Sequence, residues 1–234
     1  MNTKEGIVDW IKLLYKAILA GGAIALGGIA NIASQNKIAG SLFFCIGLFL
    51  VLSCSLNLFT GKICYLWDNK PIYLAKLAVI YQGNFLGAVT IGAIVGHISK
   101  FDSLLTAYAE GLQARMAAPW WQIILLGTLC NILIYLAVEG YRSFDKEWKK
   151  VLSLILCVSV FVLCGFEHSI ADMFYLSACG IWSGKGVLFV LLVTIGNVLG
   201  GLLIPTCNRL IKLLQSRTAP KLDEPPKTDP PANE

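Results

Sequence analysis

The sequence contains 234 residues, of which 56% are hydrophobic and only 14% are charged, and its formal net charge is +5. The charged residues lie in clusters between long apolar runs, which is the composition of a membrane protein. In a soluble protein the positive charge would suggest a nucleic-acid partner, but membrane topology accounts for it here, so we exclude that partner.

The first 16 residues mix charged and apolar side chains. Asp9 and Lys12 interrupt the hydrophobic residues between Gly6 and Lys16, which is not the pattern of a cleavable signal peptide. We predict that residues 1–16 form an amphipathic helix that lies at the membrane interface.

Six long apolar segments follow. A membrane-spanning helix needs about 20 mostly apolar residues to cross about 30 Å of hydrocarbon. Segments of this length occupy residues 17–36, 38–61, 77–99, 116–138, 151–184 and 186–208. The sequence therefore predicts an all-α membrane domain with six transmembrane helices over residues 17–212. Residues 213–234 combine prolines with alternating charges, which predicts a disordered tail.

The second apolar stretch extends to Trp67 if Lys62, its one charged residue, is allowed, so that residues 38–67 and 151–184 are each too long for one straight span. Each also contains polar residues near its middle. These residues are Ser53, Ser55, Asn57 and Thr60 in the second segment and Glu167, His168, Ser169 and Asp172 in the fifth. Irregular backbone at membrane depth is tolerated only where it lines a cavity or is buried in protein. We therefore expect both helices to be broken, with the two breaks meeting at a central pore.

Two short motifs recur in the two halves of the chain. The pairs are Gly-Asn-Phe-Leu-Gly at 83–87 with Gly-Asn-Val-Leu-Gly at 196–200, and Gly27 and Asn31 with Gly127 and Asn131. Each half holds three spans, so two such units, at about residues 17–99 and 116–212, must have opposite topology, and inverted repeats are a transport architecture. The alternative is that small residues recur wherever helices pack closely.

The distribution of lysine and arginine predicts the orientation, because basic loops are retained on the cytoplasmic side. Of the 19 basic residues, 15 fall on the side shared by both termini. We therefore predict a multi-pass protein of the inner (plasma) membrane with both termini in the cytoplasm.

Ionisable residues inside a membrane segment are costly and are functional candidates by default. Glu167 and His168 are the clearest case, since a histidine in a pore can hold an anion or exchange a proton with a weak acid. The alternative is a histidine satisfied by a neighbouring helix. Arg115 is either an interfacial anchor beside the aromatic Trp120 and Trp121 or an attractor for entering anions, and we interpret His97 as an interfacial residue.

The eight cysteines are scattered inside or beside the spans. None forms a C-x-x-C pair, and none has a histidine partner at metal-ligand spacing. We interpret them as small apolar packing residues and expect neither a metal site nor a cofactor.

Four motifs resemble the formate/nitrite transporter family over about residues 15–212. They are Leu58-Phe59-Thr60-Gly61, Gly83-Asn84-Phe85, Asn131 and Gly165-Phe166-Glu167-His168-Ser169-Ile170-Ala171. The resemblance implies an aquaporin-like fold with broken second and fifth helices. It also implies a homopentamer with one pore in each protomer, which passes small monovalent anions such as formate, nitrite, lactate or hydrosulfide.

The same resemblance implies roles for individual residues. It gives a central pore histidine (His168), its polar neighbour (Asn131), apolar constrictions (Phe44, Leu48 and Phe161) and a mobile segment in the second-helix break (Leu58, Phe59 and Thr60). Glu167 joins the substrate pathway beside His168. The family usually has lysine at Arg115, so the positive charge is kept, but any step that needs this group to lose a proton is put in doubt.

We therefore predict a channel or transporter for small monovalent anions or their conjugate acids, and not an enzyme. Arg115 would concentrate the anion, and His168 would provide or relay a proton between two apolar rings, which a neutral acid crosses more readily than an ion. A neutral-solute aquaporin-like channel is one alternative, but the sequence contains no Asn-Pro-Ala tripeptide. A membrane-embedded haem or redox protein is another, but its axial ligands would have to come from His97 and His168, which lie at different predicted depths.

Overall fold

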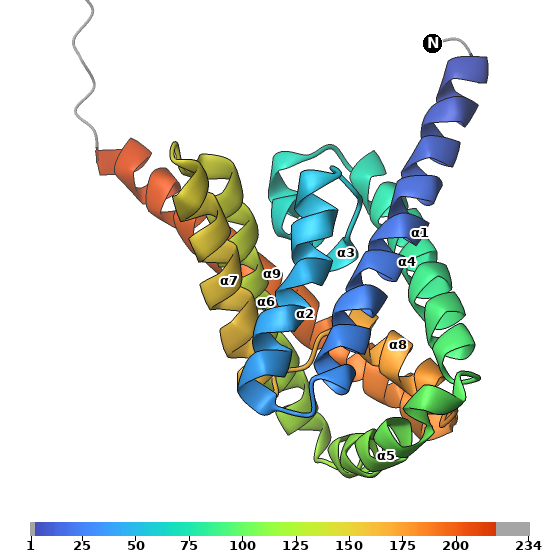
Figure 1. Ribbon diagram of the computed structural model, residues 1–234. Coiled ribbons are helices and arrows are strands. Elements are labelled where there is room, and N and C mark those ends of the chain that lie inside the picture. Colours follow the sequence, from blue (N-terminus) through green and yellow to red (C-terminus); the bar gives the residue numbers. More distant parts are fainter. Residues whose placement is uncertain (1–2, 219–234) are drawn as a thin grey trace, which may run out of the picture.

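The computed structural model describes residues 3–218. Every regular secondary-structure element in this part of the chain is a helix (Figure 1). In chain order the elements are α1 (Thr3–Ala33), α2 (Lys37–Ser53), α3 (Phe59–Lys62), the 3₁₀ helix η1 (Ile63–Asp68), α4 (Ile72–Val95), the 3₁₀ helix η2 (Ser99–Phe101), α5 (Asp102–Met116), α6 (Trp120–Ser143), α7 (Glu147–Leu163), α8 (Ser169–Ala178) and α9 (Gly184–Thr218). The described ends of the chain lie on one side of the molecule, and α5 lies across the opposite side (Figure 1).

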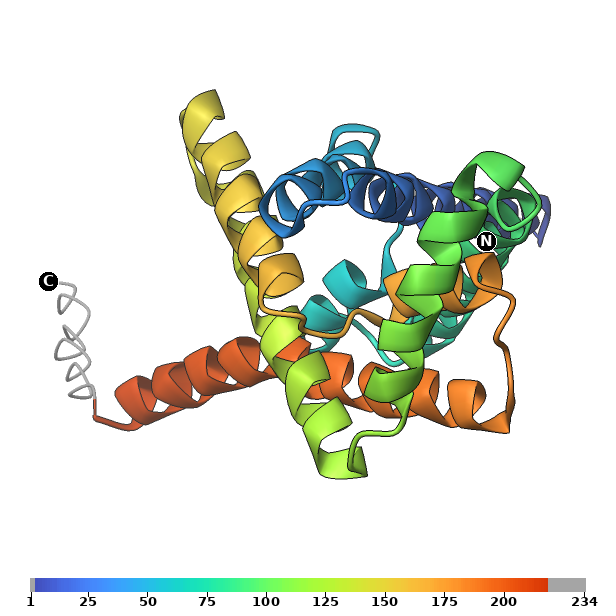
Figure 2. The same cartoon turned by 60° about the horizontal axis from the view of Figure 1, so that its bottom comes forward.

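Four helices of the described chain, α1, α4, α6 and α9, are long and apolar enough to cross a membrane. The other two predicted spans are split into α2 with α3 and α7 with α8. The first helix of each pair has 17 residues, which at 1.5 Å per residue is about 25 Å and less than the hydrocarbon thickness. The expected breaks are thus present, and the short α3 and α8 lie among the long helices, with α5 in front of them (Figure 2).

Both breaks begin with the same hydrogen-bonded turn. After α2, Ser55 adopts a left-handed φ of 50°, and the N–H of Leu56 donates to the carbonyl of Val51 (2.8 Å). After α7, Gly165 takes the equivalent place with a φ of 69°, and the following N–H donates to the carbonyl five residues earlier. This is the Schellman motif, which satisfies the last carbonyls of a helix and stops it.

The chain beyond the first break is held by Asn84 of α4. Its side-chain oxygen accepts the N–H of Phe59, the first residue of α3, at 2.8 Å. Its amide donates to the carbonyls of Ala17 in α1 (2.7 Å) and Asn57 in the break (2.8 Å). One fully buried asparagine thus satisfies two backbone groups of the break and ties them to a carbonyl of α1.

Asn197 of α9 does the same at the second break. Its side-chain oxygen accepts the N–H of Ser169, the first residue of α8, at 3.0 Å. Its amide donates to the carbonyls of Gly127 in α6 (2.8 Å) and Glu167 in the break (2.9 Å). The motifs at 83–87 and 196–200 therefore make matching contacts in the two halves of the chain.

One of the two predicted sequence matches is wrong in its register. Gly127 occupies the place that Ala17 occupies in the first half, because each supplies the carbonyl that the asparagine binds. Gly27 therefore does not correspond to Gly127, nor Asn31 to Asn131. A small residue one turn before a polar one recurs by chance on helices that pack closely.

Glycine permits the close contact between the paired helices. A Cβ atom at Gly87 would collide with the backbone of Ile18 in α1, and one at Gly200 would collide with the backbone of Thr128 in α6. Backbones this close have no space for a side chain. The helices α1 and α4 therefore form one closely packed pair, and α6 and α9 form another. The broken helices pack against these two pairs.

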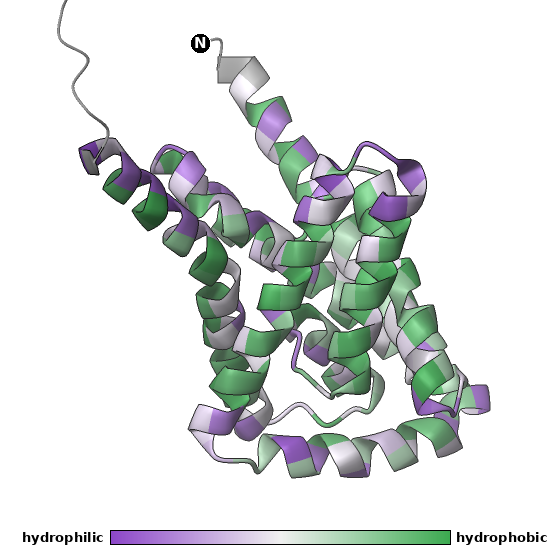
Figure 3. Cartoon of the chain, turned by 90° about the vertical axis from the view of Figure 1, so that its left-hand side faces the viewer, coloured by the Kyte–Doolittle hydropathy of each residue, from purple (hydrophilic) through white to green (hydrophobic). Residues whose placement is uncertain are grey.

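The distribution of polar and apolar residues agrees with the predicted position of the membrane. Hydrophobic residues fill the middle of the molecule, whereas hydrophilic residues gather at the end that carries the chain termini and along α5 (Figure 3). Leu188, Leu191, Ile195 and Leu199 form an exposed stripe along α9. In lipid or against another subunit such a stripe carries no hydration penalty.

Two predicted boundaries differ from the structure. The interfacial helix expected at residues 1–16 is not separate, because α1 runs without interruption from Thr3 to Ala33. The tail expected from residue 213 is helical up to Thr218, because no proline precedes Pro220 in this stretch and apolar residues continue the helix. The rest of the predicted tail lies outside the described residues.

Candidate functional site: a pore between two cavities

A cavity of about 450 Å³ opens on the α5 side of the molecule. It is lined by residues from both halves of the chain, among them Asn31, Phe44, Tyr108, Arg115, Phe161, Glu167, His168, Asp172 and Tyr175. Five of the residues predicted from the sequence to act on the substrate or to narrow the pore thus line one cavity: Phe44, Arg115, Phe161, Glu167 and His168. We call this space the α5-side cavity.

Arg115 pairs with Glu167 across 52 residues of sequence. Its Nη1 lies 2.8 Å from Glu167 Oε2, and its Nη2–H donates to the hydroxyl of Tyr108 (3.3 Å). The Arg115 side chain is 30% exposed, while that of Glu167 is 1% exposed. Arg115 therefore lies in the cavity mouth and ties α5 to the second break, whereas Trp120 remains on the exposed surface.

His168 is the N-cap of α8 and uses both ring nitrogens. Nδ1 accepts the backbone N–H of Ala171 (3.2 Å), and Nε2 lies 2.9 Å from the hydroxyl oxygen of Thr60. A nitrogen that accepts an N–H carries no proton, which assigns the single proton of a neutral ring to Nε2. His168 therefore donates to Thr60, and this bond joins the two breaks across 108 residues.

Asn131 lies behind Thr60 and lines neither this cavity nor the one described below. Its amide donates to the carbonyls of Thr60 (3.1 Å) and Asn197 (2.6 Å), and the residue is fully buried. Asn131 thus holds the backbone of α3 against α9 and fixes the position of the Thr60 hydroxyl. The structure places it as a support of the pore.

An apolar barrier closes the inner end of the α5-side cavity. Phe44 and Phe161 meet edge to face with ring centroids 5.7 Å apart, and the Phe161 ring stacks on His168 at 6.0 Å. Leu48, one turn further along α2, lines a different cavity together with Leu58. The barrier is therefore about one helical turn, or 5–6 Å, thick.

Phe59, which together with Leu58 of the mobile segment was also predicted as a constriction residue, points elsewhere. Its ring packs on Tyr81 with centroids 4.9 Å apart, and it belongs to a separate apolar cluster with Ile63 and Leu77. Leu58 is the N-cap of α3 and has extended backbone (φ −97°, ψ 127°), whereas Phe59 is the first residue of the helix, so the helical spacing does not place their side chains on one face. Only Leu58 lines one of the two cavities.

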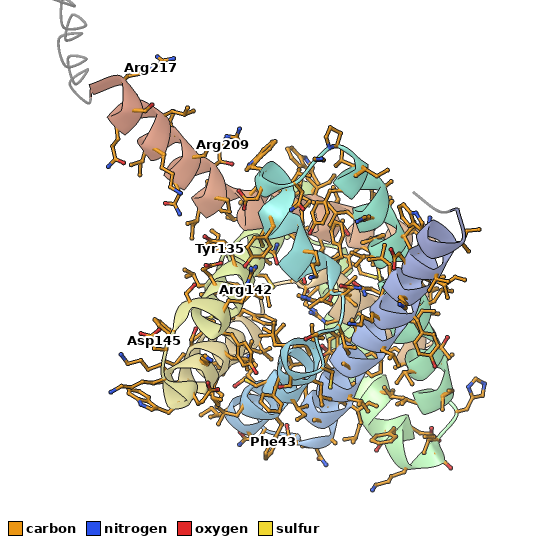
Figure 4. All side chains as sticks on the ribbon, turned by 90° about the horizontal axis from the view of Figure 1, so that it is seen from above. Phe43, Tyr135, Arg142, Asp145, Arg209 and Arg217 are labelled. Carbon is orange, nitrogen blue, oxygen red and sulfur yellow. The ribbon has the colours of Figure 1, made fainter. Side chains whose placement is uncertain are left out.

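The second cavity has a volume of about 310 Å³ and opens toward the side that carries the chain ends. Lys62 and Arg142 supply two positive charges to its lining, and the guanidinium of Arg142 lies 4.5 Å from the ring centre of Tyr65. Seen from this side, Arg142 lies toward the centre of the molecule and Arg217 at the far end of α9 (Figure 4). Each cavity is thus lined by basic residues.

Three contributors to the site received no role from the sequence. Asp172 was noted only as a polar residue in the break, although it lies one helical turn after His168 and is fully buried. Tyr108 belongs to α5, which connects two predicted spans and was not predicted as a helix. Tyr175, whose ring stacks on Tyr108 at 4.5 Å, follows Ala171 by four residues. This α-helical spacing was the one signal available for it.

A haem between the two histidines does not fit this arrangement. Both ring nitrogens of His168 are engaged in hydrogen bonds, and His97 is exposed beyond the end of α4, where its Nδ1 faces the carbonyl of Ala93. Axial ligands must face each other across one plane. The two residues therefore cannot serve as a ligand pair.

Comparison with known proteins gives one consistent result. The model of the family described as formate/nitrite transporter matches residues 2–210. Formate channel FocA of Haemophilus influenzae is 27% identical over 229 residues, covering 79% of this chain and 80% of FocA, and FocA of Escherichia coli K12 is 27% identical with 82% of each chain covered. A solved structure described as a pentameric formate channel with formate bound superposes with a TM-score of 0.73 at 25% identity, covering 88% of this chain and 98% of the other.

Proposed function

This chain belongs to the formate/nitrite transporter family, and from that premise we propose that it passes small monovalent anions, or their conjugate acids, through one pore in each protomer. It is a multi-pass membrane channel or transporter and not an enzyme. The observation that carries the proposal is the Thr60–His168 hydrogen bond beside an apolar barrier one helical turn thick, with a basic residue in the cavity on each side.

The charge and polarity of the route support passage as a neutral acid. Arg115 on one side and Lys62 on the other raise the local concentration of anions. Burying an isolated ion in an apolar medium costs tens of kcal/mol in the limit of low dielectric. Protonating a carboxylate whose pKa is about 3.5 costs only about 5 kcal/mol at neutral pH. The barrier of Phe44 and Phe161 therefore favours a substrate that is protonated, or paired with a proton donor, as it crosses.

His168 is a polar group in direct contact with this barrier, because its ring stacks on that of Phe161. Its Nε2–H and the Thr60 hydroxyl form a donor and acceptor pair that a weak acid can enter without leaving either group unsatisfied. We propose that His168 provides or relays a proton at this point, with Glu167 and Arg115 upstream of it. Net movement would then be coupled to protons and fastest at acid pH.

The architecture proposed from the sequence fits the same picture. We propose six spans arranged as two inverted units, at about residues 17–99 and 116–212, in the plasma membrane with both termini in the cytoplasm. We also propose a homopentamer, which is supported by the pentameric formate channel that the chain resembles. The exposed apolar stripe on α9 provides surface for lipid or for a neighbouring subunit.

Formate is the first substrate to test, because the relatives compared above are formate channels. Uptake of radiolabelled formate, nitrite and hydrosulfide into proteoliposomes, at acid and at neutral pH, tests the function directly. We expect saturable uptake that is faster at acid pH and that His168→Ala reduces at least about tenfold.

His97→Ala is the matched control, because His97 is exposed and makes one local bond to its own helix. It should transport as the wild type does. A His168→Ala variant with unchanged uptake and unchanged pH dependence would remove the role proposed for the pore histidine. Absence of uptake of any of the substrates by the wild type would remove the function.

A further inference from the structure

The α5-side cavity contains two buried carboxyl groups and not one. Glu167 and Asp172 are each 1% exposed, and both line this cavity. They lie close enough to interact electrostatically with each other and with Arg115. Arg115 binds Oε2 of Glu167, so that one carboxyl group has a cationic partner in direct contact, and within residues 3–218 the other has none.

One oxygen of each carboxyl group lacks a hydrogen-bond partner. These atoms are Glu167 Oε1 and Asp172 Oδ2, and each is buried. A buried polar atom without a partner destabilises the folded protein, and more so when it is charged. Both atoms accept hydrogen bonds and neither donates when ionised, so each lacks a hydrogen-bond donor. A proton held between the two carboxyl groups would be such a donor.

The neighbouring groups do not supply that proton. The charged and titratable groups that face the pair are Arg115 and Tyr108 on α5, His168 and Tyr175 at α8, Tyr81 on α4 and Cys130 on α6, and Lys37 at the exposed start of α2 lines the same cavity. Tyr108 and Thr60 already engage Arg115 and His168, respectively. Two like charges at close range in a low dielectric do not both ionise unless each is matched.

We propose that Glu167 and Asp172 share one proton and that this carboxyl pair is the proton donor to an anion drawn in by Arg115. The step breaks the O–H bond of the shared acid and forms an O–H bond on the substrate carboxylate. A neutral acid then faces the barrier, and two carboxylates remain beside Arg115. A proton from water in the cavity mouth restores the pair.

This inference rests on the proposed weak-acid transport and narrows the role of His168. The Nδ1 atom of His168 accepts the N–H of Ala171, so adding a second proton to the ring would break the cap of α8. Loss of an N-cap destabilises the helix that it begins. The carboxyl pair can gain or lose a proton without breaking a helix cap. It also lies in the same cavity as Arg115, which attracts anions, on the near side of the barrier.

Infrared difference spectroscopy of the full-length protein in lipid detects the shared proton without any transport. At neutral pH the wild type should show the carbonyl band of one protonated carboxyl group, shifted in D₂O. Asp172→Asn and Glu167→Gln should each abolish it, because either change leaves a single carboxylate beside Arg115. Glu110→Gln, on the exposed face of α5, should retain it. A wild type without this band, or a band that survives either pair variant, overturns the proposal.

Formate uptake by Asp172→Asn tests the donor role separately. We expect near-normal uptake at acid pH, where the solution supplies the acid, and a loss of about tenfold at neutral pH. Unchanged uptake at neutral pH would show that the shared proton is not the one delivered. If the wild type took up no formate, the proposed function would fail while the infrared result still decided whether the proton is shared.

Discussion

At the scale of single residues, the centre of the proposed pore depends on one pair of side chains. His168 Nε2 and Thr60 Oγ1 are 2.9 Å apart, and both residues are buried. The Thr60 hydroxyl is the acceptor for a ring whose other nitrogen is committed to the N–H of Ala171. Each group thus leaves the other no freedom to rotate, and this pre-organises the site for a small acid.

Replacing Thr60 by valine tests this pair with little change of shape. Thr60→Val leaves the Nε2–H of His168 buried and unsatisfied, which we expect to destabilise the protein by about 1–3 kcal/mol and to slow formate uptake. Thermal unfolding in detergent and uptake into proteoliposomes would measure the two effects.

Thr128→Val is the matched control, because in the described part of the chain the Thr128 hydroxyl bonds only to the carbonyl of Ile124 in its own helix. It should lower the unfolding temperature less than Thr60→Val and leave uptake unchanged. Equal uptake by Thr60→Val and the wild type would contradict the role given to the pair.

At the scale of secondary-structure elements, the two broken helices have the same construction. Each has a 17-residue helix, a left-handed residue two positions after its end and a short helix held by a buried asparagine. The left-handed residue is Ser55 in one break and Gly165 in the other. Serine pays a steric penalty in this conformation that glycine does not.

Separate substitutions of these two residues should change the stability of the protein in opposite directions. We expect Ser55→Gly to stabilise the protein by up to about 1 kcal/mol and Gly165→Ala to destabilise it by about 1 kcal/mol. A Cβ atom at Gly165 meets nothing within 4 Å, so the second change acts through the backbone alone. Denaturation midpoints of both variants would check the signs, and a destabilising Ser55→Gly would contradict the account of the break.

The positions of the helices and of the two breaks were largely predictable from the sequence. The length of the apolar segments and their polar interruptions predicted both breaks, because the need to satisfy backbone groups in a membrane is a local property. The register between the halves was not predictable, since Gly27 resembles Gly127 in sequence while Ala17 matches it in the structure. The end of α9 was also misjudged, because no residue before Pro220 stops the helix.

At the scale of the whole molecule, the two cavities that flank the proposed pore open on opposite sides. α5 lies across one side, and the described chain ends and the turn after α6 lie on the other (Figure 1). The distribution of lysine and arginine predicts that the side with the chain ends is cytoplasmic. Substrate arriving from outside would therefore reach Arg115 first.

Labelling of single cysteines in intact cells tests this orientation. In a variant without the eight native cysteines, Glu110→Cys on α5 should react with a membrane-impermeant maleimide from outside, whereas Asp145→Cys, after α6, should react only after the cells are opened. Both positions are exposed, so accessibility to water is matched. The reverse pattern would mean that the chain is inserted the other way.

The sequence by itself determined that this protein spans a membrane, that two of its helices are broken and that Glu167 and His168 lie in a break, because hydrophobic length and polar interruption are read along a single segment. Only the tertiary structure decided which residues meet. It placed Thr60 against His168, Arg115 against Glu167 and Asp172 beside that pair, and it turned Phe59 away from the pore. These contacts join segments far apart in the chain, and their geometry depends on how glycine-lined helices pack against each other, which no local pattern specifies.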